Sequence, residues 1–232
     1  MGKRIIQQAR GKGSLSYRVP KKNFVYKLKY LRVTAGEGTI RKLINSSAHS
    51  APLAKIQDSN KEFFYVPAVS GIYEGQKISL DQGTKAGDIN YLKNIPIKTK
   101  VSMIESRPRD GGKFIKTAGS FAIVNRIVED KVYLIMPSKK EKVFNGNCRA
   151  IIGVIAGDGR LEKPMMKAGK NHYAKKAKNK LWPRTSALKF NAIDHPFGSG
   201  RGKNPKPKIA KRNSPPGAKV GLLRPKRTGK KK

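Results

Sequence analysis

Asp194 and His195 are neighbours in this 232-residue chain, and their side chains could in principle do catalytic chemistry. A carboxylate can orient an imidazole, which then acts as a general base. Adjacent side chains rarely point so that one supports the other, however. Neither Ser199 nor Ser214 stands in the strained strand-to-helix turn that exposes a nucleophilic serine. We therefore expect His195 to serve binding and positioning, and we expect no catalytic residues.

Metal and redox chemistry find equally little support. His49, His172 and His195 do not have the spacing of metal ligands. Cys148 is the one cysteine, so the chain cannot build a disulfide framework or a cysteine-based zinc site. A lone cysteine beside an apolar run is typical of a small buried residue. We expect no metal and no cofactor.

Two glycine-containing loops could instead hold an anion. Glycine lets the backbone approach a phosphate closely, and successive amides can form an anion-binding concavity. Asp110–Lys113 and Gly198–Lys203 both combine such glycines with a cation. For the first loop, a plain hairpin turn explains the pattern equally well. For the second, which lies in a charge-dense segment, phosphate contact is favoured. Neither loop has the spacing of a Walker loop.

Trp182 is the one tryptophan, and it stands among few apolar neighbours in the sequence. An exposed aromatic ring can stack on a base, which is worth roughly 1–3 kcal/mol. It can equally anchor a chain segment to the protein body. Tyr17, Phe24 and Tyr173 allow the same two interpretations.

The distribution of charge favours a polyanionic partner. The chain has 52 Lys and Arg against 14 Asp and Glu, a net charge of +38, whereas solubility needs a magnitude of only about 2–8. Residues 1–36 hold 10 basic and no acidic residues, and residues 163–232 hold 22 basic residues and one acid, Asp194. Residues 37–162 hold 20 basic and 13 acidic residues, like an ordinary globular surface. This asymmetry indicates a folded body with basic arms, and nucleic acid is the usual partner.

The apolar pattern predicts a mainly β protein. Short β-branched and aromatic runs separated by turn formers predict strands at 39–44, 53–56, 63–69, 77–80, 101–104, 120–127, 132–136, 141–144 and 149–155. Two small barrels result. Residues 1–36 show no lasting period, which predicts an extended arm. After Gly157 the apolar content collapses, and we expect one short basic helix at 171–181, followed by a segment that orders only when bound.

No targeting segment or apolar run near the roughly 20 residues of a membrane helix is evident, so a soluble intracellular protein without a membrane partner is expected. Two tandem small barrels with basic arms already suggest RNA binding. The most specific signals are short strings spread over nearly the whole chain. They are Gly2-Lys3-Arg4-Ile5-Ile6, Arg10-Gly11-Lys12-Gly13, Arg149-Ala150-Ile151-Ile152-Gly153, Glu162-Lys163-Pro164, Lys167-Ala168-Gly169, Trp182-Pro183-Arg184 and Asn191-Ala192-Ile193-Asp194-His195-Pro196-Phe197.

Together these strings resemble the large-subunit ribosomal protein family L-two, in its archaeal and eukaryotic form. Phe197 stands where the bacterial form usually has a second His, which favours the former branch. There are departures: Ser199 interrupts a usual run of glycines, and His49 stands where the family often has Arg.

The resemblance implies an OB-fold barrel followed by an SH3-like barrel, with long basic extended arms at both termini. The expected domains are a basic arm at 1–36, the OB-fold-like barrel at 37–95, the SH3-like barrel at 96–168 and a basic extension at 169–232. It also implies a cytoplasmic, non-enzymatic protein of the large ribosomal subunit with no small-molecule substrate. Its partners would be large-subunit ribosomal RNA and neighbouring ribosomal proteins. It would support subunit association and the architecture around the peptidyl-transferase region.

We expect RNA contacts from basic, aromatic and glycine residues in the arms and loops. They are Lys3, Arg4, Arg10, Lys12, Arg18, Lys113, Arg149, Arg160, Lys163, Lys167, Lys170, His172, Trp182, Arg184, His195, Gly198, Gly200, Arg201, Lys203, Arg212, Lys219, Lys226 and Arg227. Two other functions stay open at this point. One is an enzyme acting on nucleic acid through Asp194 and His195. The other is a free single-strand RNA-binding translation factor built on the barrels.

Overall fold

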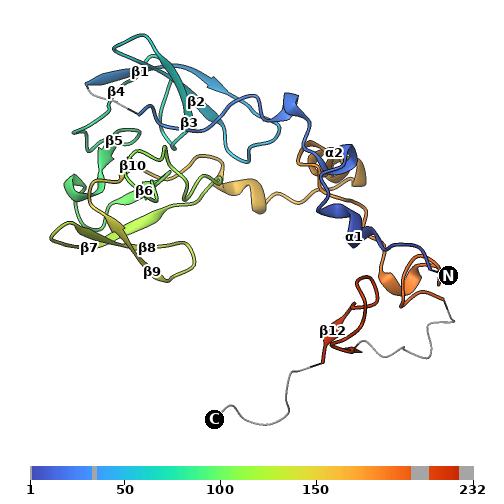
Figure 1. Cartoon of the computed structure of the whole chain (residues 1–232). Coiled ribbons are helices and arrows are strands. Elements are labelled where there is room, and N and C mark those ends of the chain that lie inside the picture. Colours follow the sequence, from blue (N-terminus) through green and yellow to red (C-terminus); the bar gives the residue numbers. More distant parts are fainter. Residues whose placement is uncertain (1, 33–35, 200–208, 225–232) are drawn as a thin grey trace, which may run out of the picture. The chain divides into compact units, whose positions relative to one another are not determined.

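The computed structural model describes residues 2–32, 36–199 and 209–224 (Figure 1). The contacts divide the chain into two compact units. We call Lys21–Lys167 the β body, and we call Met1–Pro20 together with Ala168–Lys232 the basic unit.

The first sheet of the β body has four antiparallel strands. They are β1 (Glu37–Ile44), β2 (Leu53–Asp58), β3 (Phe63–Pro67) and β4 (Lys77–Ser79), in the order β3-β2-β1-β4. A bulge between Ile40 and Lys42 in β1 shifts its register against β2. Such a bulge bends a strand and increases its twist, which helps a small sheet to curl. The four strands predicted in this region are confirmed.

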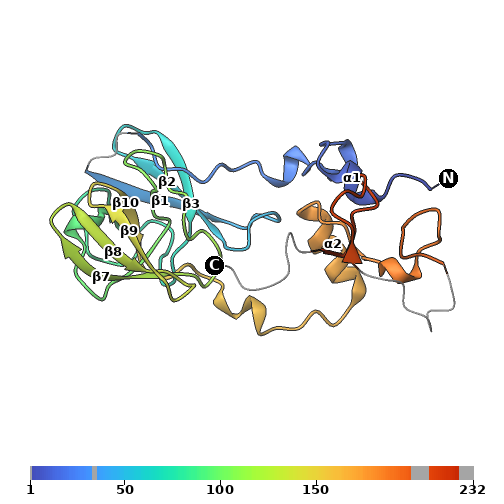
Figure 2. The same cartoon turned by 60° about the horizontal axis from the view of Figure 1, so that its bottom comes forward.

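The second sheet has six antiparallel strands. They are β5 (Ile89–Tyr91), β6 (Lys100–Ser102), β7 (Ala122–Val128), β8 (Lys131–Ile135), β9 (Glu141–Asn145) and β10 (Arg149–Ile152), in the order β5-β10-β6-β7-β8-β9. β7, β8 and β9 lie side by side in both views (Figures 1 and 2). The predicted hairpin across Glu129 and Asp130 is confirmed, because Val128 pairs with Lys131.

β5 is a strand that the apolar pattern did not predict. It is three residues long and follows the turn formers Gly87 and Asp88, so no alternation can be read from it. It lies before residue 96 in the sequence but pairs with β10 of the second sheet. The domain boundaries predicted from the sequence stay predictions.

Each sheet has its own hydrophobic core, formed where alternate side chains point inward. In β8, for example, Val132 and Leu134 are fully buried, whereas Tyr133 between them is half-buried. The first core also includes Ile89 and Ile151 from the second sheet, so the two sheets pack within one body. The mainly β prediction is confirmed, and the antiparallel sheets agree with an OB-fold barrel followed by an SH3-like barrel.

The basic unit contains the two described α-helices, α1 (Ile6–Arg10) and α2 (Ala168–Ala177). The predicted helix at 171–181 is confirmed, although α2 begins and ends earlier. The expectation that residues 1–36 are extended is wrong at α1, where Gln8 Oε1 accepts the Ile5 N–H at 3.0 Å and closes the first turn.

Short 3₁₀ segments lie at Leu15–Tyr17, Lys21–Asn23, Leu92–Asn94, Asp158–Leu161 and Ala187–Lys189. β11 (Ile209–Ala210) and β12 (Leu222–Leu223) form a parallel pair.

Candidate nucleic-acid interface

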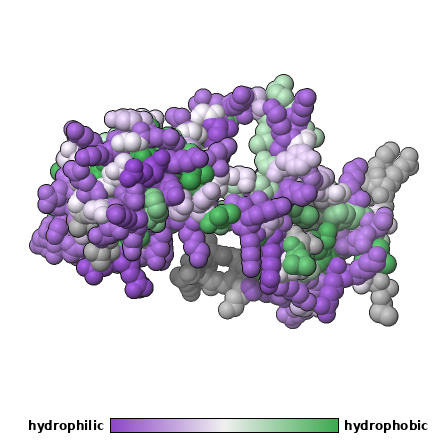
Figure 3. Space-filling view, turned by 90° about the horizontal axis from the view of Figure 1, so that it is seen from above, coloured by the Kyte–Doolittle hydropathy of each residue, from purple (hydrophilic) through white to green (hydrophobic). Residues whose placement is uncertain are grey.

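The basic unit carries most of the excess charge. Its sequence ranges, residues 1–20 and 168–232, hold 25 Lys and Arg against one acid, Asp194. The β body holds 27 Lys and Arg against 13 Asp and Glu. Mostly hydrophilic side chains cover the visible face of the β body, at the left in Figure 3 as in Figure 1. Like charges at this density repel one another, and a bound polyanion would relieve that repulsion.

Most of the predicted RNA-contact residues that the structure describes are exposed to solvent. Trp182 and His195 are half-buried, whereas Arg149 and Gly198 are buried. The exposed members are Lys3, Arg4, Arg10, Lys12, Arg18, Lys113, Arg160, Lys163, Lys167, Lys170, His172, Arg184, Arg212 and Lys219. Gly200, Arg201, Lys203, Lys226 and Arg227 lie outside the described residues.

The N-terminal segment and the loop that carries His195 come together. The Lys3 N–H donates to the Ile193 carbonyl at 2.7 Å. A cavity of about 380 Å³ is lined by residues from both segments, and five predicted RNA-contact residues meet there. They are Lys3, Arg4, Arg10, Arg184 and His195. Cations about 180 residues apart in the sequence therefore share one concave surface.

The geometry of His195 does not match that of a catalytic triad. In a triad, the imidazole Nδ1–H donates to the carboxylate. Here the Phe197 N–H donates to His195 Nδ1 at 3.0 Å, so Nδ1 is an acceptor and the neutral ring carries its proton on Nε2. The Asp194 carboxylate pairs instead with Lys3 Nζ at 3.9 Å. His195 thus offers Nε2–H as a hydrogen-bond donor.

Gly198 has a role within this loop. A Cβ on Gly198 would lie 2.3 Å from the Asn191 carbonyl oxygen, so only glycine fits. The Gly198 N–H donates to the His195 carbonyl at 2.9 Å, and the Ser199 N–H donates to the Phe190 carbonyl at 3.1 Å. Gly198 therefore shapes the loop that presents His195, and its contact with RNA stays a prediction.

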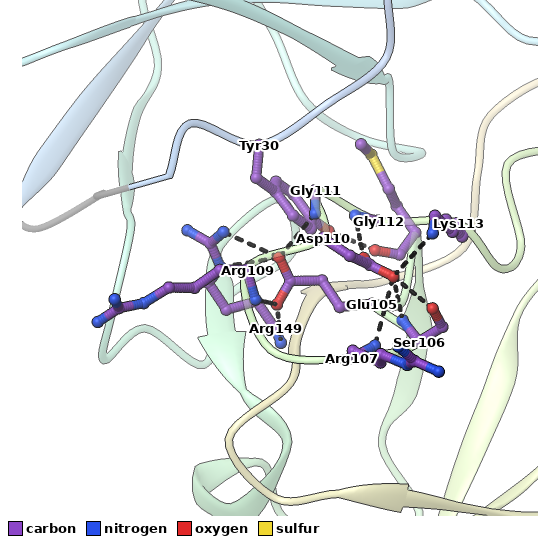
Figure 4. A network of polar contacts seen from close by, with 11 residues as sticks. Tyr30, Glu105, Ser106, Arg107, Arg109, Asp110, Gly111, Gly112, Lys113 and Arg149 are labelled. Atoms are coloured by element: carbon purple, nitrogen blue, oxygen red, sulfur yellow. Dashed lines mark hydrogen bonds and ion pairs between the residues drawn. The ribbon is translucent and has the colours of Figure 1, made fainter.

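Arg149 corrects one prediction. Its side chain is 3% exposed and pairs with Glu105, which is fully buried; Arg149 Nη2 lies 2.8 Å from Glu105 Oε1 (Figure 4). The Arg149 backbone N–H also donates to Glu105 Oε2 at 2.9 Å. A guanidinium that is buried in this way cannot reach a phosphate. The prediction that the Arg149 side chain contacts RNA is wrong, because a structural ion pair holds this side chain inside the β body.

Glu105 connects Arg149 to the loop that ends at Lys113. The Gly111 N–H donates to Glu105 Oε1 at 3.1 Å, and the Arg109 N–H donates to Oε2 at 3.2 Å. The Gly111 carbonyl in turn accepts the Tyr30 N–H at 3.0 Å (Figure 4). The buried Glu105 carboxylate therefore holds the backbone of this loop in place through hydrogen bonds.

Asp110, which belongs to the same loop, also stabilises it through hydrogen bonds. Its Oδ2 accepts hydrogen bonds from the Ser106 hydroxyl and from the N–H groups of Ser106 and Arg107, and its Oδ1 accepts the Gly112 N–H at 3.1 Å (Figure 4). Desolvation alone would raise the pKa of Asp110, but these hydrogen bonds outweigh it and lower the pKa below its ordinary value of 3.8. Lys113 Nζ lies 3.6 Å from Oδ2.

Sequence reasoning missed two cations on this loop. Arg107 and Arg109 are exposed and flank Pro108, and with exposed Lys113 they give the loop three cations. The signal was present, because three cations and two glycines stand within seven residues. What the sequence could not reveal is the internal support from Glu105 and Asp110, which makes this loop more than a flexible turn.

Some further features bear on the class of site. None of the described helices is long and apolar enough to cross a membrane. Among residues 2–32, 36–199 and 209–224, no three His, Cys, Asp or Glu side chains are grouped so that they could hold a metal ion. Cys148 is fully buried as predicted, and burial raises the pKa of its thiol to about 11.

Comparison with known proteins shows the family of the chain. The family model described as "Ribosomal Proteins L2, C-terminal domain" matches residues 85–217, which is more than half of the chain. The chain is 44% identical to the large ribosomal subunit protein uL2 of Archaeoglobus fulgidus, with 99% of each chain covered. The chain belongs to the uL2 family. Members of the same name from Methanococcoides burtonii and Korarchaeum cryptofilum are 40% and 38% identical, and both alignments cover 100% of this chain.

The family assignment confirms the resemblance inferred from the short sequence strings. The three uL2 relatives named here are archaeal, in agreement with the archaeal or eukaryotic form that Phe197 favoured. The matched region includes β5 to β10, α2 and the His195 loop. The loop of Arg107 to Lys113 lies within the matched region, whereas the cavity lined by His195 combines residues of that region with residues of the N-terminal segment.

Proposed function

We propose that this protein is a structural constituent of the large ribosomal subunit and that it binds large-subunit ribosomal RNA. The single observation that carries this proposal is the charge of the basic unit, 25 basic residues against Asp194 alone. Relatives named as large ribosomal subunit proteins cover the whole chain, which supports placing it in that particle.

Two surfaces would contact the RNA backbone. The first is the cavity of the basic unit, where Lys3, Arg4, Arg10 and Arg184 could each neutralise a phosphate. The second is the rigid loop of Arg107 to Lys113 on the β body, whose cations project from a fixed backbone. Because structured RNA is read largely through its shape, 2′-hydroxyls and phosphates, fixed cations on two surfaces suit this kind of partner.

The proposal includes the finer roles that the family resemblance implied. The C-terminal segment of the basic unit would reach toward the peptidyl-transferase region, and the protein would support the association of the two subunits. Neighbouring ribosomal proteins would be further partners, and the location would be the cytoplasm. The hydrogen bond from the Phe197 N–H to His195 Nδ1 supports a positioning role for His195, because an accepting Nδ1 has no N–H to donate to a triad carboxylate. We therefore propose a protein that is not an enzyme.

Sedimentation of the tagged protein through a density gradient tests the proposal. We expect the full chain to co-migrate with large subunits, whereas a chain lacking residues 171–232 should no longer be incorporated stably. Normal incorporation of the truncated chain would contradict the role given to the basic unit. It would favour the alternative of a free single-strand RNA-binding translation factor, in which the barrels bind alone.

A further inference from the structure

A second cavity of the basic unit lies where α2 ends. The helix ends at Ala177, and Asn179 then takes the left-handed conformation with a φ of 49°. The N–H groups of Asn179 and Lys180 donate to the carbonyls of Lys176 and Lys175 at 3.0 and 2.9 Å. This turn closes the helix and returns the chain toward it, as a left-handed residue at a helix C-terminus typically does.

The turn brings aromatic rings and cations to one cavity of about 300 Å³. Trp182 and His172 lie with their ring centroids 6.4 Å apart and their planes at 60°. Tyr17, from the other end of the chain, lines the same cavity. A volume near 300 Å³ is at the lower end of the range for small-ligand sites. Three rings around such a space can receive a flat, π-faced group.

Asn179 adds an unsatisfied donor to this cavity. Its Nδ2 is almost fully buried and has no hydrogen-bond partner, although buried polar atoms normally have one. Asn179 is one of the residues that line the cavity. The group that occupies the cavity should therefore bring a hydrogen-bond acceptor, which a carbonyl-bearing nucleobase presents at its edge.

Lys176 and Lys180 complete the chemistry. Both line the cavity, and both are exposed to solvent. A flat group with an edge acceptor and a nearby negative charge has the chemistry of a nucleotide in an RNA strand. Splayed, unstacked bases are the usual targets of aromatic side chains in RNA recognition.

We propose that this cavity binds one unstacked, carbonyl-bearing base of an RNA strand. The base stacks among the rings of Trp182, His172 and Tyr17, and it accepts a hydrogen bond from Asn179 Nδ2. Lys176 and Lys180 neutralise its flanking phosphates. This inference rests on the proposed RNA-binding function and specifies one contact within it. It also selects stacking over anchoring as the role of Trp182.

Fluorescence of the full-length protein tests this inference, because Trp182 is the one tryptophan of the chain. The probes are a short oligouridylate and an abasic ribose-phosphate strand of equal length, which carry the same number of phosphates. We expect the oligouridylate to quench Trp182 and the abasic strand to bind without quenching. Tyr17→Leu and His172→Leu should each weaken binding of the oligouridylate by about 5- to 150-fold, the range of a lost stacking contact.

Asn179→Gly separates the hydrogen bond from the fold, because glycine keeps the left-handed turn and lacks the donor. It should weaken oligouridylate binding and leave binding of the abasic strand unchanged. Asn179→Asp, which also tolerates this conformation, should weaken oligouridylate binding further, because it adds a negative charge. Circular dichroism checks that both variants fold. Tyr73→Leu, an exposed ring in the β body, is the matched control and should have no effect.

Equal quenching by both strands, or unchanged affinity of Asn179→Gly for the oligouridylate, would overturn the base-binding site while leaving RNA binding intact. Failure of both strands and of large-subunit ribosomal RNA to bind would contradict the proposed function itself. The two failures are therefore distinguishable.

Discussion

At the scale of the residue, the Arg149–Glu105 pair shows how a cation can be structural in a protein with 52 Lys and Arg. Both side chains are almost completely buried, and Glu105 also accepts backbone N–H groups from the loop before Lys113. Removing one partner of a buried ion pair leaves the other charge uncompensated in a medium of low dielectric constant.

Arg149→Met should therefore lower the free energy of unfolding by about 3–5 kcal/mol. The measurement is denaturant-induced unfolding. Arg126→Met is the matched control, because Arg126 pairs with Glu141 at 3.2 Å on an exposed face, where the loss should be about 0–1 kcal/mol. Equal stability losses in the two variants would contradict the structural role of Arg149.

Asp110 should make the stability of the β body depend on pH. Its pKa in the folded protein lies below the ordinary value, so the folded state favours the charged carboxylate. The resulting stabilisation is fully present above the unfolded-state pKa and is lost as the pH falls through the folded-state pKa. Asp110→Asn should lower the free energy of unfolding at neutral pH by about 1–3 kcal/mol, since several hydrogen bonds weaken.

The stability difference between the parent and Asp110→Asn should then shrink as the pH falls below about 4, near the ordinary carboxyl pKa. Thermal unfolding across a pH series measures it. A difference that stays constant down to strongly acidic pH would show that the carboxylate charge of Asp110 contributes nothing.

At the scale of the element, the loop from Phe190 to Ser199 depends on the absence of one side chain. Gly198→Ala would place a Cβ against the carbonyls of Asn191 and Phe190, and backbone carbonyls cannot yield cheaply. Gly169→Ala is the control, because a Cβ at that position of α2 meets nothing within 4 Å.

We expect Gly198→Ala to weaken binding of ribosomal RNA by disturbing the cavity lined by His195. Gly169→Ala should leave binding unchanged and stabilise α2 slightly, because alanine is the better helix former. RNA affinities measured side by side for the two variants check this. An intact affinity in Gly198→Ala would separate the loop from RNA binding.

Several elements could be predicted from the sequence and others could not, for physical reasons. Strands such as β2 and β8 alternate buried and open positions over five or six residues, which a period of two reveals. β5 is too short to show a period, and α1 is held by a single side-chain hydrogen bond from Ile5 to Gln8. The Arg149–Glu105 pair spans 44 residues of sequence, so a pattern search could not distinguish this cation from an exposed one.

At the scale of the whole molecule, charge is divided between two units of different kinds. The β body buries two hydrophobic cores and carries 13 of the 14 acids, so it can hold its fold through packing. The basic unit has 25 cations and Asp194, and none of the residues of α2 is buried. Its cations should therefore dominate affinity for RNA, while the β body supplies shape.

The dependence of RNA affinity on salt tests this division most directly. Each phosphate that a cation neutralises releases condensed counterions, so the logarithm of the binding constant falls with the logarithm of the salt concentration by about 0.7–0.9 per phosphate. For the full chain and large-subunit ribosomal RNA, we predict a slope of roughly −5 or steeper, as six or more phosphate contacts require. A slope near −1, the value of about one contact, would contradict the account.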